Sequence, residues 1–307
     1  MIRAITGSIS TTRALGLDIS STMIKAAEVT FSREGLILNR AVVKEVRNNE
    51  ISQPLKTIVA ESGFKTKQVA LGLSSPQIVV QPFQFPKMPN EEMVSAIQLE
   101  AEHAILNGHE PSQIIVDWHL LNDASDGVRR GILAVIPKEV LSAGIDTVKA
   151  AGLKPSIVDV KGLALWNAYW TLVEKRKPSS RTTLILNVDS DATNLVIVRS
   201  PDTLILSRDI QLGADSFQNN KDRWLSELHD SLVYARSKGG LRTLEDVLVT
   251  GLGANEILPA LEVALGLNAK LWNPLDYLDQ KETNGSFDKS KGPLLSVAIG
   301  LALRRLG

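Results

Sequence analysis

The feature that most constrains this chain is an internal duplication. An apolar strand that begins at Leu15 ends in Asp18, and a polar turn and two further strands continue the meander to residue 46. The same order returns over residues 183–210, where an apolar strand is followed by Asp189, a polar turn and two more strands. A repeat of this length outweighs any single motif. It predicts an α/β fold built from two related lobes.

The turn in the first copy carries side chains that suit a phosphate. Ser20, Ser21 and Thr22 follow Asp18, and Lys25 lies seven residues after that aspartate. Such a turn can wrap a phosphate with backbone N–H groups and hydroxyls while the carboxylate holds a hydrated Mg²⁺, and the lysine is placed to reach an outer phosphate. An ordinary hairpin with a polar turn explains the same residues. The stretch alone does not separate these two interpretations.

Composition narrows the class of protein. The chain has 307 residues, enough for about two lobes, and its 34 basic residues equal its 34 acidic ones, so charge gives no case for nucleic acid. The lack of cysteine excludes disulfides and thiolate metal sites, and the four histidines show no zinc-ligand spacing. No apolar run approaches the roughly 18–20 residues of a membrane span, and the N-terminus lacks a signal-peptide core. A cytoplasmic protein is expected.

Turn residues and apolar periodicity divide the chain into segments. Residues 65–154 predict a small α+β unit inserted after the first meander, and the charged run EKRKPSSR at residues 174–181 predicts a linker between lobes. In the second half, TGLGA at residues 250–254 opens a helix, a turn type that suits a ligand lying against backbone. The predicted parts are a flexible tail at 1–13, a first lobe at 14–64 plus 155–178, the inserted subdomain at 65–154, a second lobe at 179–278, a mobile loop at 279–292 and a terminal helix at 293–307 packed back on the body.

Several stretches together resemble one family. LGLDISSTMIK at residues 15–25, the run FPKMPNEEMVSAIQLEAEHAI at 85–105, the run from Ala134 to residue 165, and the ending with NPLDYL and LLSVAIGLALRRL are similar to the PilM proteins of type IV pilus assembly, within the actin-like ATPase superfamily. The likeness covers nearly the whole chain. It implies the actin-like fold, a duplicated ribonuclease-H-like fold with two lobes, with the inserted PilM-type subdomain.

The resemblance also implies partners and a site. PilM proteins are cytoplasmic adaptors that bind the short N-terminal tail of PilN, an inner-membrane protein, in a groove between the first lobe and the inserted subdomain. Self-association is a further expectation, and contact with the membrane would come only through the partner. If nucleotide binding is retained, ATP with Mg²⁺ held by Asp18 and Asp189 would contact residues of the two turns and of the glycine turn. These residues are Asp18, Ser20, Ser21, Thr22, Lys25, Asp189, Thr193, Gly251 and Gly253.

The positions at which this chain departs from the family all belong to the expected nucleotide-binding site. Ser20 and Asp191 stand where actin-like loops have glycine, and Leu252 replaces one of two adjacent glycines. A second carboxylate beside Asp189 would repel a polyphosphate by on the order of 1–4 kcal/mol. Only QLGADSFQNNK lies where the family places another helical subdomain, so the second lobe is expected to be truncated. We therefore expect a scaffold with impaired or absent ATP binding and no catalytic residue. The alternative is a nucleotide-binding ATPase or ATP-gated switch in the same machine.

Overall fold

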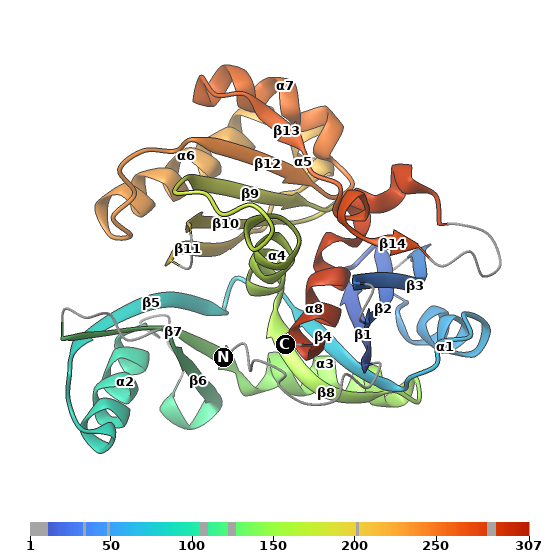
Figure 1. Cartoon of the computed structure of the whole chain (residues 1–307), viewed down its shortest axis with the longest axis horizontal. Coiled ribbons are helices and arrows are strands. Elements are labelled where there is room, and N and C mark those ends of the chain that lie inside the picture. The colour runs from blue at the N-terminus through green and yellow to red at the C-terminus, as the bar shows by residue number, and fades with distance from the viewer. Residues whose placement is uncertain are drawn as a thin grey trace.

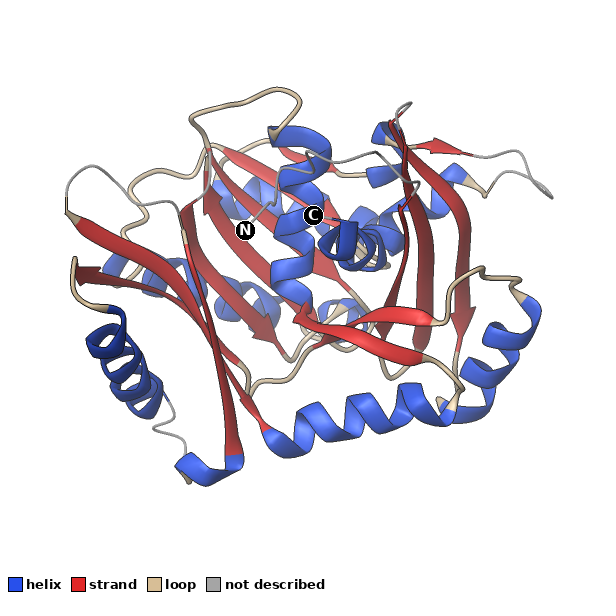
Figure 2. Ribbon diagram, turned by 60° about the horizontal axis from the view of Figure 1, so that its bottom comes forward, coloured by secondary structure: helices blue, strands red, loops and turns tan. Residues whose placement is uncertain are grey.

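The computed structural model describes residues 12–32, 35–47, 50–104, 110–121, 127–200, 203–280 and 287–306. The predicted tail at residues 1–13 lies almost wholly outside these ranges, and the predicted loop at 279–292 lies partly outside them. Two sheets face each other across a pair of central helices (Figures 1 and 2). Among the described residues, no helix is both long enough and apolar enough to cross a membrane.

The two sheets confirm the predicted duplication. In the first sheet, an antiparallel meander is followed by two parallel strands in the order β3-β2-β1-β4-β8, and in the second the order is β11-β10-β9-β12-β13. The first-sheet strands are β1 (Thr12–Ile19), β2 (Met23–Ser32), β3 (Gly35–Glu45), β4 (Gln68–Leu73), β8 (Lys154–Val160) and the short β14 (Asp279–Gln280). Their counterparts are β9 (Thr182–Val188), β10 (Thr193–Arg199), β11 (Thr203–Ile210), β12 (Asp246–Thr250) and β13 (Ala269–Leu271).

Residues 65–154, predicted as one inserted subdomain, divide between the two sheets. Strand β4 pairs with β1 and β8, and helix α3 (Lys138–Ala150) packs Val148 into the first-lobe core. Strands β5 (Val79–Pro86), β7 (Val128–Pro137) and β6 (Ile114–Leu120) instead extend the second sheet beyond β11. Helix α2 (Asn90–Ala104) packs against these three strands. The division follows because β4 is the first-lobe counterpart of β12, so the first sheet needs it beside β1.

Two helices fill the space between the sheets (Figure 1). Helix α4 (Lys161–Tyr169) continues into a π-helical turn at Trp170–Glu174 and packs on β10, and helix α8 (Ser296–Leu306) packs on β1; the two helices also contact each other. A side chain at Gly16 would overlap the carbonyl oxygen of Ala298, so glycine there lets α8 lie directly on β1. Helix α8, which lies within the terminal segment predicted at residues 293–307, is buried along most of its length.

Helices on the outer faces complete the lobes. Helix α1 (Ser52–Glu61) buries Leu55 and Ile58 against the first sheet, and α6 (Lys221–Ser237) buries Trp224 and Leu228 against the second. Between β11 and α6 the chain forms only the short helix α5 (Ala214–Asn219), where the sequence predicts a truncated subdomain. The remaining elements are α7 (Ala254–Leu265) and 3₁₀ turns at Pro111–Gln113, Pro274–Tyr277 and Lys289–Leu295.

Candidate functional site

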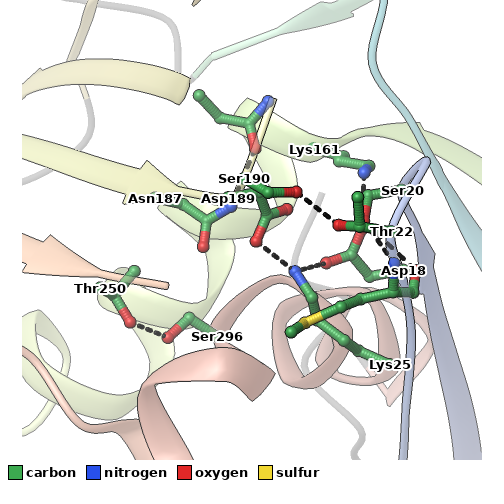
Figure 3. Close-up of polar contacts among 12 residues, drawn as sticks. Asp18, Ser20, Thr22, Lys25, Lys161, Asn187, Asp189, Ser190, Thr250 and Ser296 are labelled. Carbon is green, nitrogen blue, oxygen red and sulfur yellow. Dashed lines mark hydrogen bonds and ion pairs between the residues drawn. The ribbon is translucent and has the colours of Figure 1, made fainter. Parts of the chain in front are cut away.

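The two predicted phosphate turns face each other and are in direct contact (Figure 3). The turn between β1 and β2 meets the turn between β9 and β10. Thr22 Oγ1 and Ser190 Oγ share a hydrogen bond, and Ser21 Oγ donates to the Asp191 carboxylate. The hydroxyls of Ser21 and Thr22, which the sequence assigns to a phosphate, are thus bonded to side chains of the opposite lobe.

Four buried charges alternate in sign beneath these turns. Lys161 Nζ lies 2.7 Å from Asp18 Oδ1, and Lys25 Nζ lies 3.2 Å from Asp18 Oδ2. Lys25 also bonds to Asp189 Oδ1 across the lobes, as Figure 3 shows. Lys161 Nζ makes a further bond of 2.7 Å to the Ile19 carbonyl oxygen. We call Lys161, Asp18, Lys25 and Asp189 the charge chain.

Asp18 and Lys25 hold each other ionised although both side chains are fully buried. Burial by itself would raise the pKa of Asp18, but Lys161 and Lys25 outweigh it and lower that pKa to about 2. Burial would likewise lower the pKa of Lys25, yet Asp18 and Asp189 raise it above its ordinary value. Both groups are therefore charged at neutral pH, and each compensates the other.

A second polar network, of two asparagines and Asp209, lies beside the charge chain and also joins the two lobes. Asn187 Nδ2 donates to Asn194 Oδ1 at 3.0 Å, and Asn194 Nδ2 donates to Asp209 Oδ1 at 2.7 Å. The other Asp209 oxygen accepts bonds from Ser74 Oγ at 2.7 Å and Ser75 N at 3.1 Å, at the end of β4. Burial raises the pKa of Asp209, against the opposing hydrogen bonds from Ser74 and Asn194.

Two hydroxyls of the predicted site do not contribute to the contact between the two turns. Thr193 Oγ1 donates to the Leu212 carbonyl oxygen at 2.8 Å and accepts from Trp224 Nε1 at 3.2 Å, so its hydroxyl belongs to the second-lobe core. Ser20 Oγ accepts from the backbone N–H of Met23 at 3.1 Å and thereby closes its own turn. Both hydroxyls have structural partners.

The glycine turn after β12 packs against the protein's own chain. Gly251 has a φ of +93°, and a Cβ there would lie 2.5 Å from the Val188 carbonyl oxygen. A Cβ at Gly253 would lie 2.7 Å from that of Ala214. Thr250, just before the turn, donates to the Pro293 carbonyl oxygen at 2.8 Å and bonds to Ser296 Oγ at 2.6 Å (Figure 3). The two glycines therefore allow the turn to pack closely against β9, α5 and the segment before α8.

Sequence reasoning missed Lys161. It is the first residue of α4, only 4% exposed, and it neutralises Asp18 from the side opposite Lys25. The signal was a single lysine between an apolar strand and the apolar helix GLAL, a position where an unpaired cation would be costly. A buried lysine needs a carboxylate partner, and Asp18 at the end of an apolar strand is one that the sequence offers.

The two lobes and their facing turns define a class, the proteins with the actin-like fold. Within this class the sequence assigns the chain further. The family model for the type IV pilus assembly protein PilM matches residues 16–231, so the chain belongs to the PilM family.

Solved structures agree with this assignment at the level of the fold. A structure described as the PilM-PilN type IV pilus biogenesis complex superposes with a TM-score of 0.82 at 23% identity, covering 96% of this chain and 99% of that one. The cytoplasmic domain of EpsL, an inner-membrane component of the type II secretion system of Vibrio cholerae, gives 0.51 at 12% identity, with 95% of each chain covered. Among curated proteins, none matches the chain.

Mg-ATP is the group that the actin-like fold implies, and in this structure the side chains expected to hold it are bonded to one another. Asp18 and Asp189, the two carboxylates that would hold the metal, are both bonded to Lys25. Nowhere in the described ranges do three or more histidine, aspartate or glutamate side chains converge as metal ligands. The lysine that would reach a phosphate is fully buried between carboxylates. We therefore derive no step through a bound nucleotide.

Proposed function

We propose that this protein is an adaptor of a type IV pilus assembly machine that captures the cytoplasmic N-terminal tail of a PilN-like inner-membrane protein. Membership of the PilM family supports the role in pilus assembly. The superposition on a PilM-PilN complex over 96% of the chain supports the choice of partner. In this proposal the protein is cytoplasmic and reaches the inner membrane through that partner.

The proposed location of the tail is between the first lobe, residues 14–64 plus 155–178, and the inserted segment, residues 65–154. Two strand edges support it: β8 ends the six-stranded sheet, and β6 ends the eight-stranded sheet. A strand edge offers backbone N–H and C=O groups to an extended peptide, which is a common way of binding tails. Self-association is a separate prediction, which sedimentation of the purified protein would check.

We further propose that nucleotide binding is impaired, and one observation carries this proposal. Lys25 is bonded at once to Asp18 and to Asp189, so a polyphosphate can enter only after this buried pairing opens. Breaking a buried ion pair costs about 3–5 kcal/mol. Such a cost lowers affinity by a factor on the order of 10²–10⁴ unless the ligand restores every contact.

A second candidate is an ATP-binding enzyme or switch in the same machine. The observation that favours it is the convergence of Asp18, Lys25 and Asp189 between the lobes, as an actin-like phosphate site requires. In that case Mg-ATP would separate the two turns and replace the contacts of the charge chain.

Calorimetric titration of a synthetic PilN-type N-terminal tail, with and without Mg-ATP, tests the proposal. We expect the tail to bind with the same affinity in both conditions, because the charge chain closes the cleft without a ligand. A peptide of the same composition in scrambled order is the control. Absence of tail binding together with ATP turnover would contradict the adaptor and support the second candidate.

A further inference from the structure

Basic side chains gather at the end of the second lobe that lies away from the charge chain. Three segments meet there, at the starts of β9 and β12 and the end of β10, on the side of these strands away from α8 in Figure 1. Arg199 Nη2 donates to the Gly240 carbonyl oxygen at 2.8 Å, and the Ser200 N–H donates to that of Arg181 at 3.1 Å. These bonds hold the linker, the β10 end and the loop after α6 side by side.

Seven cations of these segments form what we call the basic end. Each is exposed or half-exposed, and they are Lys175, Lys177, Arg181, Arg199, Arg236, Lys238 and Arg242. Because the whole chain has equal numbers of acidic and basic residues, such a cluster marks a strongly uneven distribution of charge.

The carboxylates within the described part of these segments are already engaged. Glu174 is buried and accepts hydrogen bonds from Ser179 and from Tyr169. Glu245 Oε2 accepts the backbone N–H of Thr182 at 2.8 Å. Asp246 pairs with Arg181 at 2.8 Å. Across the described residues, no ion pair joins either lysine of the linker or Lys238 to a carboxylate, so these ammonium groups are available to an external anion.

Apolar side chains lie next to these cations. Val233 and Tyr234, in the last turns of α6, are 46% and 51% exposed, and Lys238 follows one turn later. Lysine and arginine beside an exposed aromatic ring and an aliphatic side chain are the combination found where proteins rest on a lipid headgroup layer. The cations are also spread over three segments and do not converge on one pocket, which suits a surface of many anions.

We propose that the basic end docks on the anionic lipid headgroups of a membrane. This choice of ligand, over an acidic protein or a nucleic acid, rests on the proposed function, which holds the chain beside the inner membrane through its partner. The captured tail would be one attachment to the membrane, and contact with headgroups would be a second. The second contact would also fix the orientation of the protein relative to the membrane. Two weak attachments together give stable recruitment where either one alone does not.

Co-sedimentation with lipid vesicles tests this proposal on the full chain. Vesicles containing about a quarter phosphatidylglycerol should bind the protein at low ionic strength and lose it at about 0.5 M salt, whereas pure phosphatidylcholine vesicles should not bind it. The triple variant Lys175→Gln, Lys177→Gln, Lys238→Gln should partition on the order of a hundredfold more weakly. The matched control is Lys56→Gln, Lys67→Gln, Lys149→Gln, three exposed lysines of the other lobe with the same change of net charge.

The outcomes separate this inference from the proposed function. Three results would overturn the proposal that the basic end binds lipid. They are an equal loss of vesicle binding in the triple variant and its control, equal binding to neutral and anionic vesicles, and no binding to anionic vesicles. Retention of acidic proteins or nucleic acid with no vesicle binding would also overturn it. The PilN-type tail is titrated against the same triple variant. An unchanged affinity there leaves the adaptor proposal standing whatever the vesicles show.

Discussion

The β1–β2 hairpin and the β9–β10 hairpin have turns of the same length and the same strand pairing. They differ in what joins the paired side chains, which is an ion pair in the first hairpin and an amide hydrogen bond in the second. Four residues lie between the paired Ile19 and Ile24 in the first hairpin, and four lie between Val188 and Thr193 in the second. One step back from each turn, the first hairpin pairs Asp18 with Lys25 and the second pairs Asn187 with Asn194.

The difference shows how one duplicated position can be stabilised in two ways. In the second hairpin, the amide of Asn187 donates a hydrogen bond of 3.0 Å to the amide oxygen of Asn194, and neither side chain is charged. Asp18 and Lys25 are charged and buried, so they also need Lys161 from α4 and Asp189 from the other lobe. The β1–β2 hairpin, here the ionic hairpin, therefore depends on charged partners from α4 and from the other lobe. In the β9–β10 hairpin, here the amide hairpin, the bond between the paired residues carries no charge and lies within one lobe.

The largest expected effect comes from removing the shared cation. Lys25→Met leaves Asp189 without its cation and Asp18 with one of its two, so we expect the free energy of unfolding to fall by about 3–5 kcal/mol. Urea denaturation monitored by circular dichroism measures it. Lys44→Met, at an exposed position of β3, is the control and should change stability by less than about 0.5 kcal/mol. A loss below about 1 kcal/mol in Lys25→Met would contradict the charge chain.

Acid should weaken the ionic hairpin selectively. The folded-state pKa of Asp18 is about 2, against an ordinary value of 3.8, so its contribution to stability is complete above about pH 5 and is lost progressively between about pH 5 and pH 1. By linkage the change is about 2 kcal/mol. Denaturation curves of the wild type and of Asp18→Asn over this window measure the difference. Parallel pH dependence in the two proteins would mean that Asp18 is not held ionised by its neighbours.

The amide hairpin should tolerate truncation better. Asn187→Ala removes the donor to Asn194 and leaves a buried carbonyl oxygen unpaired, which should cost about 1–2 kcal/mol. The measurement is the same urea denaturation, with Asn255→Ala on the exposed surface of α7 as its control. A cost equal to that of Lys25→Met would remove the distinction between the two hairpins.

The smallest effect is expected at the tips of the turns. Ser21→Ala deletes an exposed hydrogen bond to Asp191, and such a bond contributes less than about 1 kcal/mol. The melting temperature from scanning calorimetry should therefore change by no more than a few degrees. A loss of stability as large as that of Lys25→Met would show that the tips, and not the buried charges, hold the lobes together.

Much of the fold could be predicted from local pattern. The two meanders, their aspartate-ended strands and the apolar terminal helix follow from alternation, turn residues and repetition, because each depends on neighbours in sequence. The division of residues 65–154 between two sheets could not be predicted, because strand order depends on long-range pairing. In particular, β5 joins β11 through the single residue pair Val80 and Ser207.

The sequence predicts which charged residues lie together, but it does not predict the bonds that they form with one another. Asp18, Lys25 and Asp189 were identified as one group, and the structure brings them together. That Lys25 bonds to both carboxylates depends on how two lobes separated by more than 160 residues close on each other, which no local spacing reveals. Thr193 was included through its place in the turn, although its hydroxyl serves Trp224 in the core.

The most direct test of the account is calorimetric titration of the wild-type protein with Mg-ATP alone. Because Lys25 and its two aspartates satisfy one another, we expect no measurable heat of binding up to millimolar nucleotide. A dissociation constant in the micromolar range would contradict the account, since it would mean that the charge chain opens readily and that the cleft remains a working nucleotide site.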